Sequence, residues 1–197
     1  PLEKGNGYQV KTSGGEYQAK NVVMATGSFQ KPKIPAFSAD IPAGILQLHS
    51  GHYRNPSQLP EGAVFVVGSG QSGMQIAEEL YQSGRAVYLC TGTAPRVPRR
   101  YRGRDIVSWL VDTGFFDQTV DKLPSPKARL IGNPQVSGKN GGHSLNLHQF
   151  ARDGVRLLGH IGGAQNGKIM FASDLRLNLA TVDKAEKDII AMIDKYI

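Results

Sequence analysis

The sequence predicts an α/β fold in which helices cover a parallel sheet. An apolar run at residues 63–67 ("AVFVV") stops at the first of three glycines spaced G-x-G-x-x-G. A helical pattern begins within this motif, and a second apolar run, "AVYLC" at 86–90, follows it. Strand, glycine turn, helix and strand in this order make a βαβ unit, whose two strands are parallel.

Each glycine of the motif has a separate expected role. Gly68 permits the tight turn at the strand end, Gly70 lets the main chain approach a pyrophosphate, and Gly73 lets the helix pack closely on the sheet. The helix that begins near Gln71 points its free N–H groups and positive dipole end at the anion. The alternative is a tight turn that binds nothing. The candidate cofactor-binding residues of this turn are Gly68, Ser69, Gly70, Gln71, Ser72 and Gly73.

The residues after the second strand predict NADP(H) rather than NAD(H). NAD-binding units place an acidic residue about 20 residues after the glycines, where it binds the ribose hydroxyls. No carboxylate occurs between Glu79 and Asp105, and the sequence instead runs "APRVPRRYRGR". Hydroxyl and guanidinium groups suit a 2′-phosphate. The candidates are Thr91, Thr93, Arg96, Arg99, Arg100 and Arg102, with Arg96 and Arg99 as first choices.

The alternative for these arginines is that they pair with acids elsewhere or lie in solvent. The formal net charge of +7 is explained equally well by an ordinary solvated surface. A nucleic-acid role is poorly supported, because the basic cluster has only Tyr101 as an interleaved aromatic residue and directly follows a nucleotide motif.

The composition limits which other classes of protein this chain can belong to. The 197 residues, 40% of them hydrophobic, suffice for one buried core. No apolar run of about 18 residues occurs, so no membrane span is expected. The single cysteine, Cys90, excludes an internal disulfide or CxxC pair and favours a reducing, cytoplasmic setting. His143 and His148 lack a third ligand nearby, so no metal site is expected.

The other elements follow from apolar periodicity and turn residues. Residues 8–12 and 16–20 flank "SGG" and predict a hairpin, and "NVVMATGS" at 21–28 predicts a short strand. The proline-rich residues 29–44 predict an extended connector. Further along we expect a basic loop at 91–104, a helix at 105–114, a loop at 117–142 and a helix at 144–154. Strands at 155–163 and 168–173 are expected to pair around "AQNG". The last predicted element is a helix at 173–197, capped by Ser173 or Asp174.

Three further stretches resemble one family. "VVMATGSFQKPKIP" resembles the segment that leaves the FAD domain in two-dinucleotide-binding flavoproteins, and "HSGHYRNP" resembles a stretch of flavin-containing monooxygenases. "PRRYRGRDIVSWL" and "GGHSLNLHQFARDGVRLLGHI" are similar to bacterial flavoproteins labelled as linked to potassium transport. The family's first glycine motif, which binds FAD, is not in this sequence. Because the chain also starts at Pro1, we interpret it as a piece of a longer protein.

The resemblance implies a division of the chain and a Rossmann-like NADP-binding sheet. Residues 1–35 would be a remnant of the FAD-binding domain, 36–160 the NADPH-binding domain, and 161–197 a segment that returns to the FAD domain, with its final helix. Ala25, Thr26 and Gly27 would lie near the ADP part of FAD, although "ATG" also merely ends a strand in many proteins. We expect residues 1–30 to be partly disordered or to mediate homodimerisation, because the missing part leaves apolar surface exposed.

The resemblance also implies a function. NADPH would reduce FAD by hydride transfer, and the reduced flavin would oxygenate a small-molecule substrate; this piece alone is expected to be inactive. His49 and Ser50 would lie near the domain junction, where they bind cofactor or serve as a hinge; no catalytic residue is assigned. The rivals are a flavin disulfide-reductase-like enzyme, which needs a second cysteine, and a non-catalytic nucleotide-sensing module of potassium transport.

Overall fold

The chain separates into two compact units. The structure, a computed structural model, describes residues 7–27, 31–123, 125, 126, 128, 132 and 134–197. The units are Pro1–Lys33 and Ile34–Ile197, and each is described by itself. The division at 1–35, 36–160 and 161–197, with its assignment to an FAD-binding and an NADPH-binding part, stays a prediction.

The first unit contains the predicted hairpin. β1 (Tyr8–Thr12) pairs antiparallel with β2 (Gly15–Ala19), which confirms the prediction. The predicted strand at 21–28 is wrong for residues 21–27, which form no strand, and Ser28 lies outside the described residues. A strand needs a partner for its main-chain hydrogen bonds, and Val23 and Met24 are 85% and 80% exposed here.

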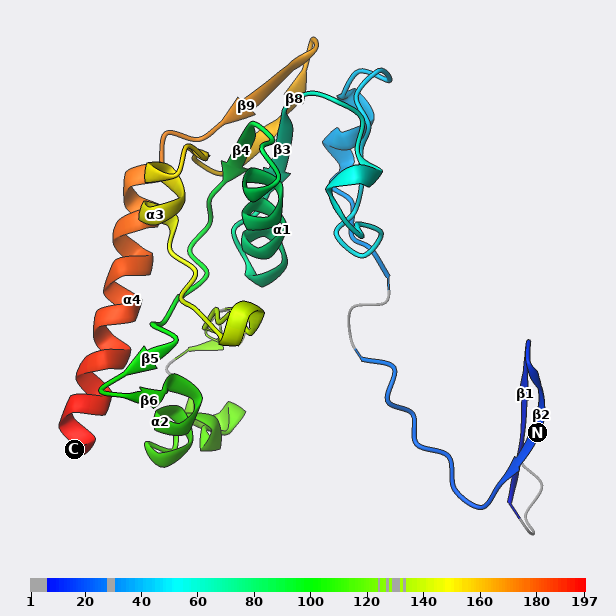
Figure 1. The fold of residues 1–197 in the computed structure, drawn as a ribbon, viewed down its shortest axis with the longest axis vertical. Helices are drawn as coiled ribbons and strands as arrows, with labels where there is room; N and C mark the ends of the chain where they lie inside the picture. Colours follow the sequence, from blue (N-terminus) through cyan, green and yellow to red (C-terminus); the bar gives the residue numbers. More distant parts are fainter. Residues whose placement is uncertain (1–6, 28–30, 124, 127, 129–131, 133) are drawn as a thin grey trace. The chain divides into compact units, whose positions relative to one another are not determined.

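The second unit contains the predicted parallel sheet (Figure 1). β3 (Val64–Val67) pairs in parallel with β4 (Val87–Cys90), and β4 pairs in parallel with β7 (Arg156–Leu158). α1 (Gln71–Gln82) connects β3 to β4, as the glycine motif predicts. The order β3-β4-β7 brings the carboxyl ends of all three strands to one edge, where ligands bind in sheets of this kind.

A hydrophobic core joins α1 to the sheet and to α3 (Leu147–Arg152). Met74, Ala77 and Leu80 from α1 are buried, at the spacing that the helical pattern predicts. Burial of a side chain such as Leu80 contributes about 2 kcal/mol. Asn146 caps α3 by accepting from the main-chain N–H groups of its first turn. The other core members are Val66, Val87, Leu89, Leu145, Leu147, Phe150 and Val155.

The apolar run at 155–163 divides into two strands, where the sequence predicts one. Its first part is β7 of the parallel sheet, and its second part, β8 (Ile161–Gln165), pairs with β9 (Lys168–Phe171) as predicted. The division lies at Gly159, whose missing Cβ would stand 2.1 Å from the carbonyl oxygen of Ala172. Only glycine permits this close approach of two main chains.

A second core lies at the other end of the long helix α4 (Leu175–Tyr196), which runs from the sheet to the β5, β6 and α2 region (Figure 1). The predicted basic loop contains a short hairpin, β5 (Arg100–Tyr101) with β6 (Arg104–Asp105), and the predicted helix α2 (Ile106–Asp112) follows, capped by Asp105. Trp109 is part of this core. The buried members are Val97, Ile106, Trp109, Leu110 and Ile193.

Short 3-10 helices interrupt the segments expected to be irregular. They are η1 (Ala36–Asp40), η2 (Pro56–Gln58), η3 (Phe115–Asp117), η4 (Val120–Lys122) and η6 (Lys139–Gly141). The predicted extended connector at 29–44 therefore contains a helical turn. Searched over the described ranges, the chain has no helix with the length and apolarity that crossing a membrane requires.

The close packing of α1 on β3 generates a prediction. A Cβ at Gly73 would stand 1.8 Å from the carbonyl oxygen of Gly68, whereas one at Gly70 would meet open space. We therefore expect Gly73→Ala to destabilise the chain by about 2–3 kcal/mol, which lowers Tm by about 5–10 °C. Gly70→Ala is the matched control and is expected to melt near the wild-type temperature. Equal melting temperatures for all three proteins would contradict the packing described.

Candidate functional site

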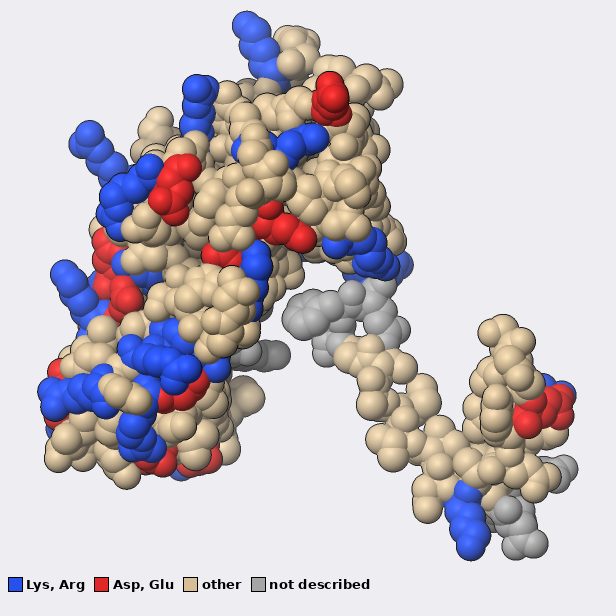
Figure 2. Space-filling view, in the orientation of Figure 1, with Lys and Arg blue, Asp and Glu red and all other residues tan. Residues whose placement is uncertain are grey.

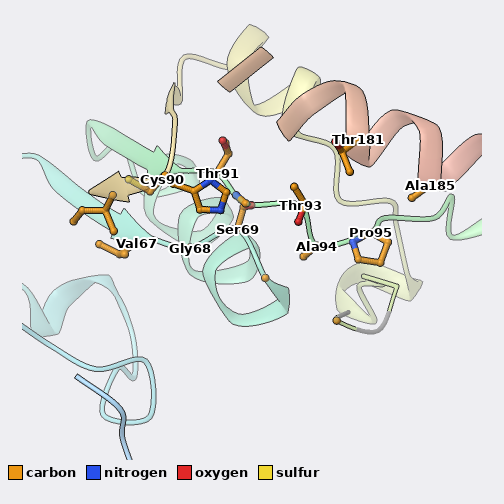
Figure 3. Close-up of a pocket in the computed structure, with 15 residues that line it drawn as sticks. Val67, Gly68, Ser69, Cys90, Thr91, Thr93, Ala94, Pro95, Thr181 and Ala185 are labelled. Atoms are coloured by element: carbon orange, nitrogen blue, oxygen red, sulfur yellow. The ribbon is translucent and has the colours of Figure 1, made fainter. Parts of the chain in front are cut away.

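A cleft of about 760 Å³ opens above the glycine turn (Figure 3). It lies at the carboxyl ends of β3 and β4, the edge at which the sequence predicts a ligand. The first half of the chain supplies Val67, Gly68, Ser69, Gly70 and Cys90 to Pro95, and the second half supplies Gly132, His160, Ile161, Thr181 and Ala185.

The main chain of the glycine turn is bare on its cleft side. Gly68 has a φ of +97°, a conformation that favours glycine. A Cβ added at Gly68 or at Gly70 would have no heavy atom within 4 Å. The first N–H groups of α1 follow directly, and no acidic residue occupies its first turn. The turn therefore offers the open main chain and the helix N-terminus that a pyrophosphate requires.

Side-chain hydrogen bonds hold the turn in this shape. The buried Ser69 hydroxyl accepts from the main-chain N–H of Gly92 (2.8 Å), which ties the turn to the end of β4. The Gln135 amide donates to the carbonyl oxygen of Ser69. The Gln71 side chain makes two bonds to the main chain of Val136, at 2.8 and 3.1 Å. Gln71 thus braces the turn with its side chain, while Ser72 is exposed.

Helix α4 forms the opposite wall of the cleft. Thr181 and Ala185 lie across the cleft from Thr93, Ala94 and Pro95 (Figure 3). Thr91 is buried, and its hydroxyl donates to the carbonyl oxygen of Leu158 on β7 (2.8 Å). The predicted residues Gly68, Ser69, Gly70 and Thr91 therefore line one cleft.

His160 lies two residues beyond the end of β7 and lines the cleft. Its Nδ1 lies 2.6 Å from Asp174 Oδ2, and its main-chain N–H donates to Asp174 Oδ1 (2.9 Å). The Asn178 amide lies 3.2 Å from the same ring nitrogen. Hydrogen bonds from the main chain and ring of His160 lower the pKa of Asp174 below its ordinary value. Asp174, one of the two predicted cap residues, occupies the N-cap position of α4, but its side chain makes no capping hydrogen bond.

Arg96 faces helix α4, and the cleft lining does not include it. Its Nη2 lies 2.6 Å from Asp183 and its Nε lies 2.8 Å from Glu186, while Nη1 is buried without a partner. Burial opposes ionisation of Asp183, but hydrogen bonds from His148 and Arg96 outweigh it and lower its pKa. Assignment of Arg96 to a 2′-phosphate stays a prediction, and this ion pair gives it a competing role.

The other arginines of the cluster gather over β5, β6 and α2, among acidic residues (Figure 2). Arg99 pairs with Asp105 (2.8 Å), and Arg100 donates to the carbonyl oxygen of Gly141 (3.3 Å). Arg102 and Arg104 pair with Asp194 and Asp112. None of these arginines lines the cleft, so their assignment to the 2′-phosphate also stays a prediction.

The segment that contains His49 and Ser50 lies outside the cleft lining. His49 Nδ1 accepts from the main-chain N–H of Gly51 (3.1 Å), and Ser50 is exposed. The Tyr53 hydroxyl donates to Glu79 on α1 (2.9 Å), which ties the segment to the βαβ unit. Burial and the Glu79 carboxylate raise the Tyr53 pKa. The cofactor or hinge role of His49 and Ser50 stays a prediction.

Residues 25–27 belong to the first unit and form no strand. Their assignment to an FAD contact stays a prediction, as do dimerisation and disorder at 1–30, of which residues 1–6 and 28–30 lie outside the described set.

Cys90 lines the cleft but is a poor nucleophile. Its side chain is buried, and burial together with the Asp174 carboxylate raises the thiol pKa to about 11. The thiolate is the reactive form, so the structure favours a packing role. His143 pairs with Glu78 (2.6 Å) and His148 with Asp183 (3.0 Å). The described residues contain no group of three metal-ligating side chains.

The wall contributed by the second half of the chain was missed by the sequence prediction. Of this wall, His160 lies two residues beyond β7 and so at the ligand edge of the parallel sheet. Because the sequence predicts 155–163 as a strand paired with 168–173, this signal could not be read before the structure placed β7 beside β4. Thr181 and Ala185 had none: their contribution depends on where α4 crosses the sheet, and helical periodicity does not specify this.

The fold defines the class of protein: an α/β domain with a Rossmann-like parallel sheet. Residues 2–113 match the family described as "Pyridine nucleotide-disulphide oxidoreductase". The chain therefore belongs to this family of flavoproteins, and within it resembles the flavin-containing monooxygenase-like group.

Individual relatives support this membership. The chain is 35% identical over 176 residues to "Uncharacterized oxidoreductase CzcO" of Bacillus subtilis, which covers 88% of this chain and 49% of the relative. It is 44% identical over 111 residues to a CzcO-like oxidoreductase of Geobacillus kaustophilus, covering 56% and 32%. It is also 39% identical over 74 residues to "Flavin-containing monooxygenase iboF" of Amanita muscaria, covering 34% and 14%. The chain spans half or less of each relative.

The Arg96 ion pair generates a prediction. Arg96→Met leaves two carboxylates, 32% and 21% exposed, without their guanidinium partner. Because these groups are partly solvated, we expect a loss of about 2 kcal/mol in unfolding free energy, below the range for fully buried pairs. Arg102→Met removes an exposed pair and is expected to change stability by less than about 1 kcal/mol. Unfolding in urea measures both.

The same variants separate the two roles of Arg96. If Arg96 serves only the ion pair, Arg96→Met keeps any preference for NADPH over NADH. Unchanged stability together with a lost NADPH preference would contradict the structural role and support the phosphate contact.

Proposed function

We propose that this chain forms the NADPH-binding part of an FAD-dependent, monooxygenase-like oxidoreductase. The observation that carries the proposal is the open glycine turn beneath a cleft at the carboxyl edge of the β3-β4-β7 sheet. The cleft volume of about 760 Å³ falls within the range of ligand pockets. Membership in a family of flavin-dependent oxidoreductases supports the redox assignment.

Each part of the cleft has a task in binding the dinucleotide. The bare main chain at Gly68 and Gly70 admits the pyrophosphate, and the first N–H groups of α1 donate to it. Ser69, bonded to Gly92, fixes the separation between the turn and the end of β4. The apolar wall formed by Pro95, Ala185 and Ile161 excludes water from the cofactor.

The choice of NADPH follows from the end of β4. The residues there are Thr91, Gly92 and Thr93, and none of them is acidic. A carboxylate at this position favours the free ribose hydroxyls of NAD, and its absence removes the repulsion that a 2′-phosphate would meet. The arginines at 96, 99 and 100, which the sequence suggested for the phosphate, do not line the cleft.

FAD, when bound, accepts the hydride of NADPH and carries the oxygen chemistry. The protein's contribution would be to hold the nicotinamide dinucleotide in place while the flavin is supplied next to it. The disulfide-reductase rival requires a reactive thiol pair, and the one cysteine of this chain is buried with a raised pKa. The monooxygenase-like relatives favour the oxygenation branch.

Binding to the isolated chain tests the proposal. We expect NADPH to bind the 197-residue chain and Gly70→Val to weaken binding by about 100-fold, because the new side chain occupies the space that the pyrophosphate needs. Isothermal titration calorimetry gives both affinities. Gly44→Val, at another exposed glycine with open surroundings, is the matched control and should bind as the wild type does.

Three results would contradict the proposal. Absence of NADPH binding to the folded wild-type chain would remove it, and equal binding by wild type and Gly70→Val would move the site away from the glycine turn. A preparation of the longer protein that binds NADPH but contains no flavin and consumes no oxygen would support the sensing module instead.

A further inference from the structure

We propose that His160, held by Asp174, is the cationic contact for the adenosine 2′-phosphate and so determines specificity for NADP(H). This inference rests on the proposed function, since it concerns the same cleft. It assigns to one histidine the role that the sequence suggested for an arginine.

The His160 ring lies at the end of the cleft where the adenosine ribose would bind. His160 lies two residues beyond the end of β7, the strand next to β4, and it lines the cleft. A Cβ added at Gly92 would lie 3.5 Å from His160 Nε2, so this nitrogen faces the main chain just beyond β4. In βαβ nucleotide-binding units, the residues at the end of the second strand meet the adenosine ribose. The free ring nitrogen is therefore at the ribose end of the cleft.

The side chains that line the cleft offer a phosphate one possible cationic partner. Among the described residues that line it, His160 is the only side chain able to carry a positive charge. Arg96 and Arg99 are engaged with carboxylates and do not line the cleft. A phosphate dianion in the cleft therefore finds its cationic partner at His160.

The hydrogen bond to Asp174 orients the His160 ring so that Nε2 is available to a ligand. An ionised carboxylate only accepts hydrogen bonds, so the 2.6 Å contact with Asp174 assigns a proton to Nδ1. Nε2 is then the atom left to face the ligand, and in the imidazolium form it donates a charge-assisted hydrogen bond. Asp174 is a positioning residue in this arrangement.

Asp174 does not itself act as the ribose-binding acid of an NAD site. Both of its oxygens are occupied by His160, Oδ1 by the main-chain N–H and Oδ2 by the ring. It is also absent from the cleft lining. The group presented to the ribose is thus the imidazole, which favours a phosphate over a free hydroxyl.

Two ligands that differ only in the 2′-phosphate test the inference: adenosine 2′,5′-bisphosphate and adenosine 5′-monophosphate. We expect His160→Gln to weaken binding of the bisphosphate by about 10- to 100-fold, the value of one charge-assisted hydrogen bond. Binding of the monophosphate should change by less than about 3-fold, because it lacks the group that His160 contacts. NADPH and NADH should show the same contrast.

Two further variants control the experiment. His160→Lys restores a cation and is expected to recover most of the preference for the bisphosphate. His52→Ala removes another exposed histidine, one outside the cleft lining, and should leave both affinities unchanged. Circular dichroism checks that each variant is folded.

The outcomes separate the inference from the proposed function. If the wild-type chain binds neither NADPH nor the bisphosphate, the proposed function fails. If it binds both and His160→Gln keeps the full preference for the 2′-phosphate, the inference fails while the function stands. Equal weakening of both ligands would overturn the 2′-phosphate assignment, because it would place His160 at the shared part of the nucleotide.

Discussion

The structure depends on the contact between α1 and the end of β3. The missing side chain of Gly73 lets the helix approach until its main chain meets the carbonyl oxygen of Gly68. That approach aims the helix N-terminus along the sheet edge and leaves the turn between them open. A helix displaced outward by one methyl group would no longer direct its free N–H groups at the cleft. The proposed anion site is thus a consequence of packing, because the glycine turn serves both.

Helix α4 turns this edge into a cleft. It crosses from the sheet, where Asn178 bonds to Thr91, to the second core around Trp109 and Ile193. The buried Arg96 joins the loop after β4 to two acids of this helix. The wall formed by Thr181 and Ala185 is therefore positioned by contacts at both ends of α4 and by the ion pair between them. The Arg96 guanidinium thus links the loop after β4 to the helix that forms the opposite wall of the cleft.

The βαβ unit could be predicted from the sequence because its signals are local. An apolar run ends at a glycine, three glycines follow at a fixed spacing, and Met74, Ala77 and Leu80 share one face of the helix. The hairpin at 8–19 and helices α2, α3 and α4 have equally local signals. The strand expected at 21–28 failed because strand formation depends on a partner, which local sequence does not specify. The division of 155–163 between two sheets depends on where Gly159 meets Ala172, a contact across the chain.

The candidate site could be predicted only where the glycine motif and the end of β4 line the cleft. The arginine cluster had the right composition for a phosphate, yet composition does not show which carboxylates lie opposite, and Arg96 meets Asp183 and Glu186 from a helix some 90 residues later. His160 was overlooked for the converse reason: one histidine after a short strand carries no pattern until the strand is known to join the sheet.

The central claim is that the main chain of residues 68–73 binds the phosphates of a nicotinamide dinucleotide. Amide chemical shifts of the isotopically labelled chain, recorded as NADP⁺ is added, test it most directly. The account predicts saturable shifts of the amides of Gly70, Gln71 and Ser72, together with those of Gly92 and Thr93, while the amides of Gly138 and Gly167 stay in place. Saturable shifts elsewhere, with the amides of 70–72 unmoved, would contradict it.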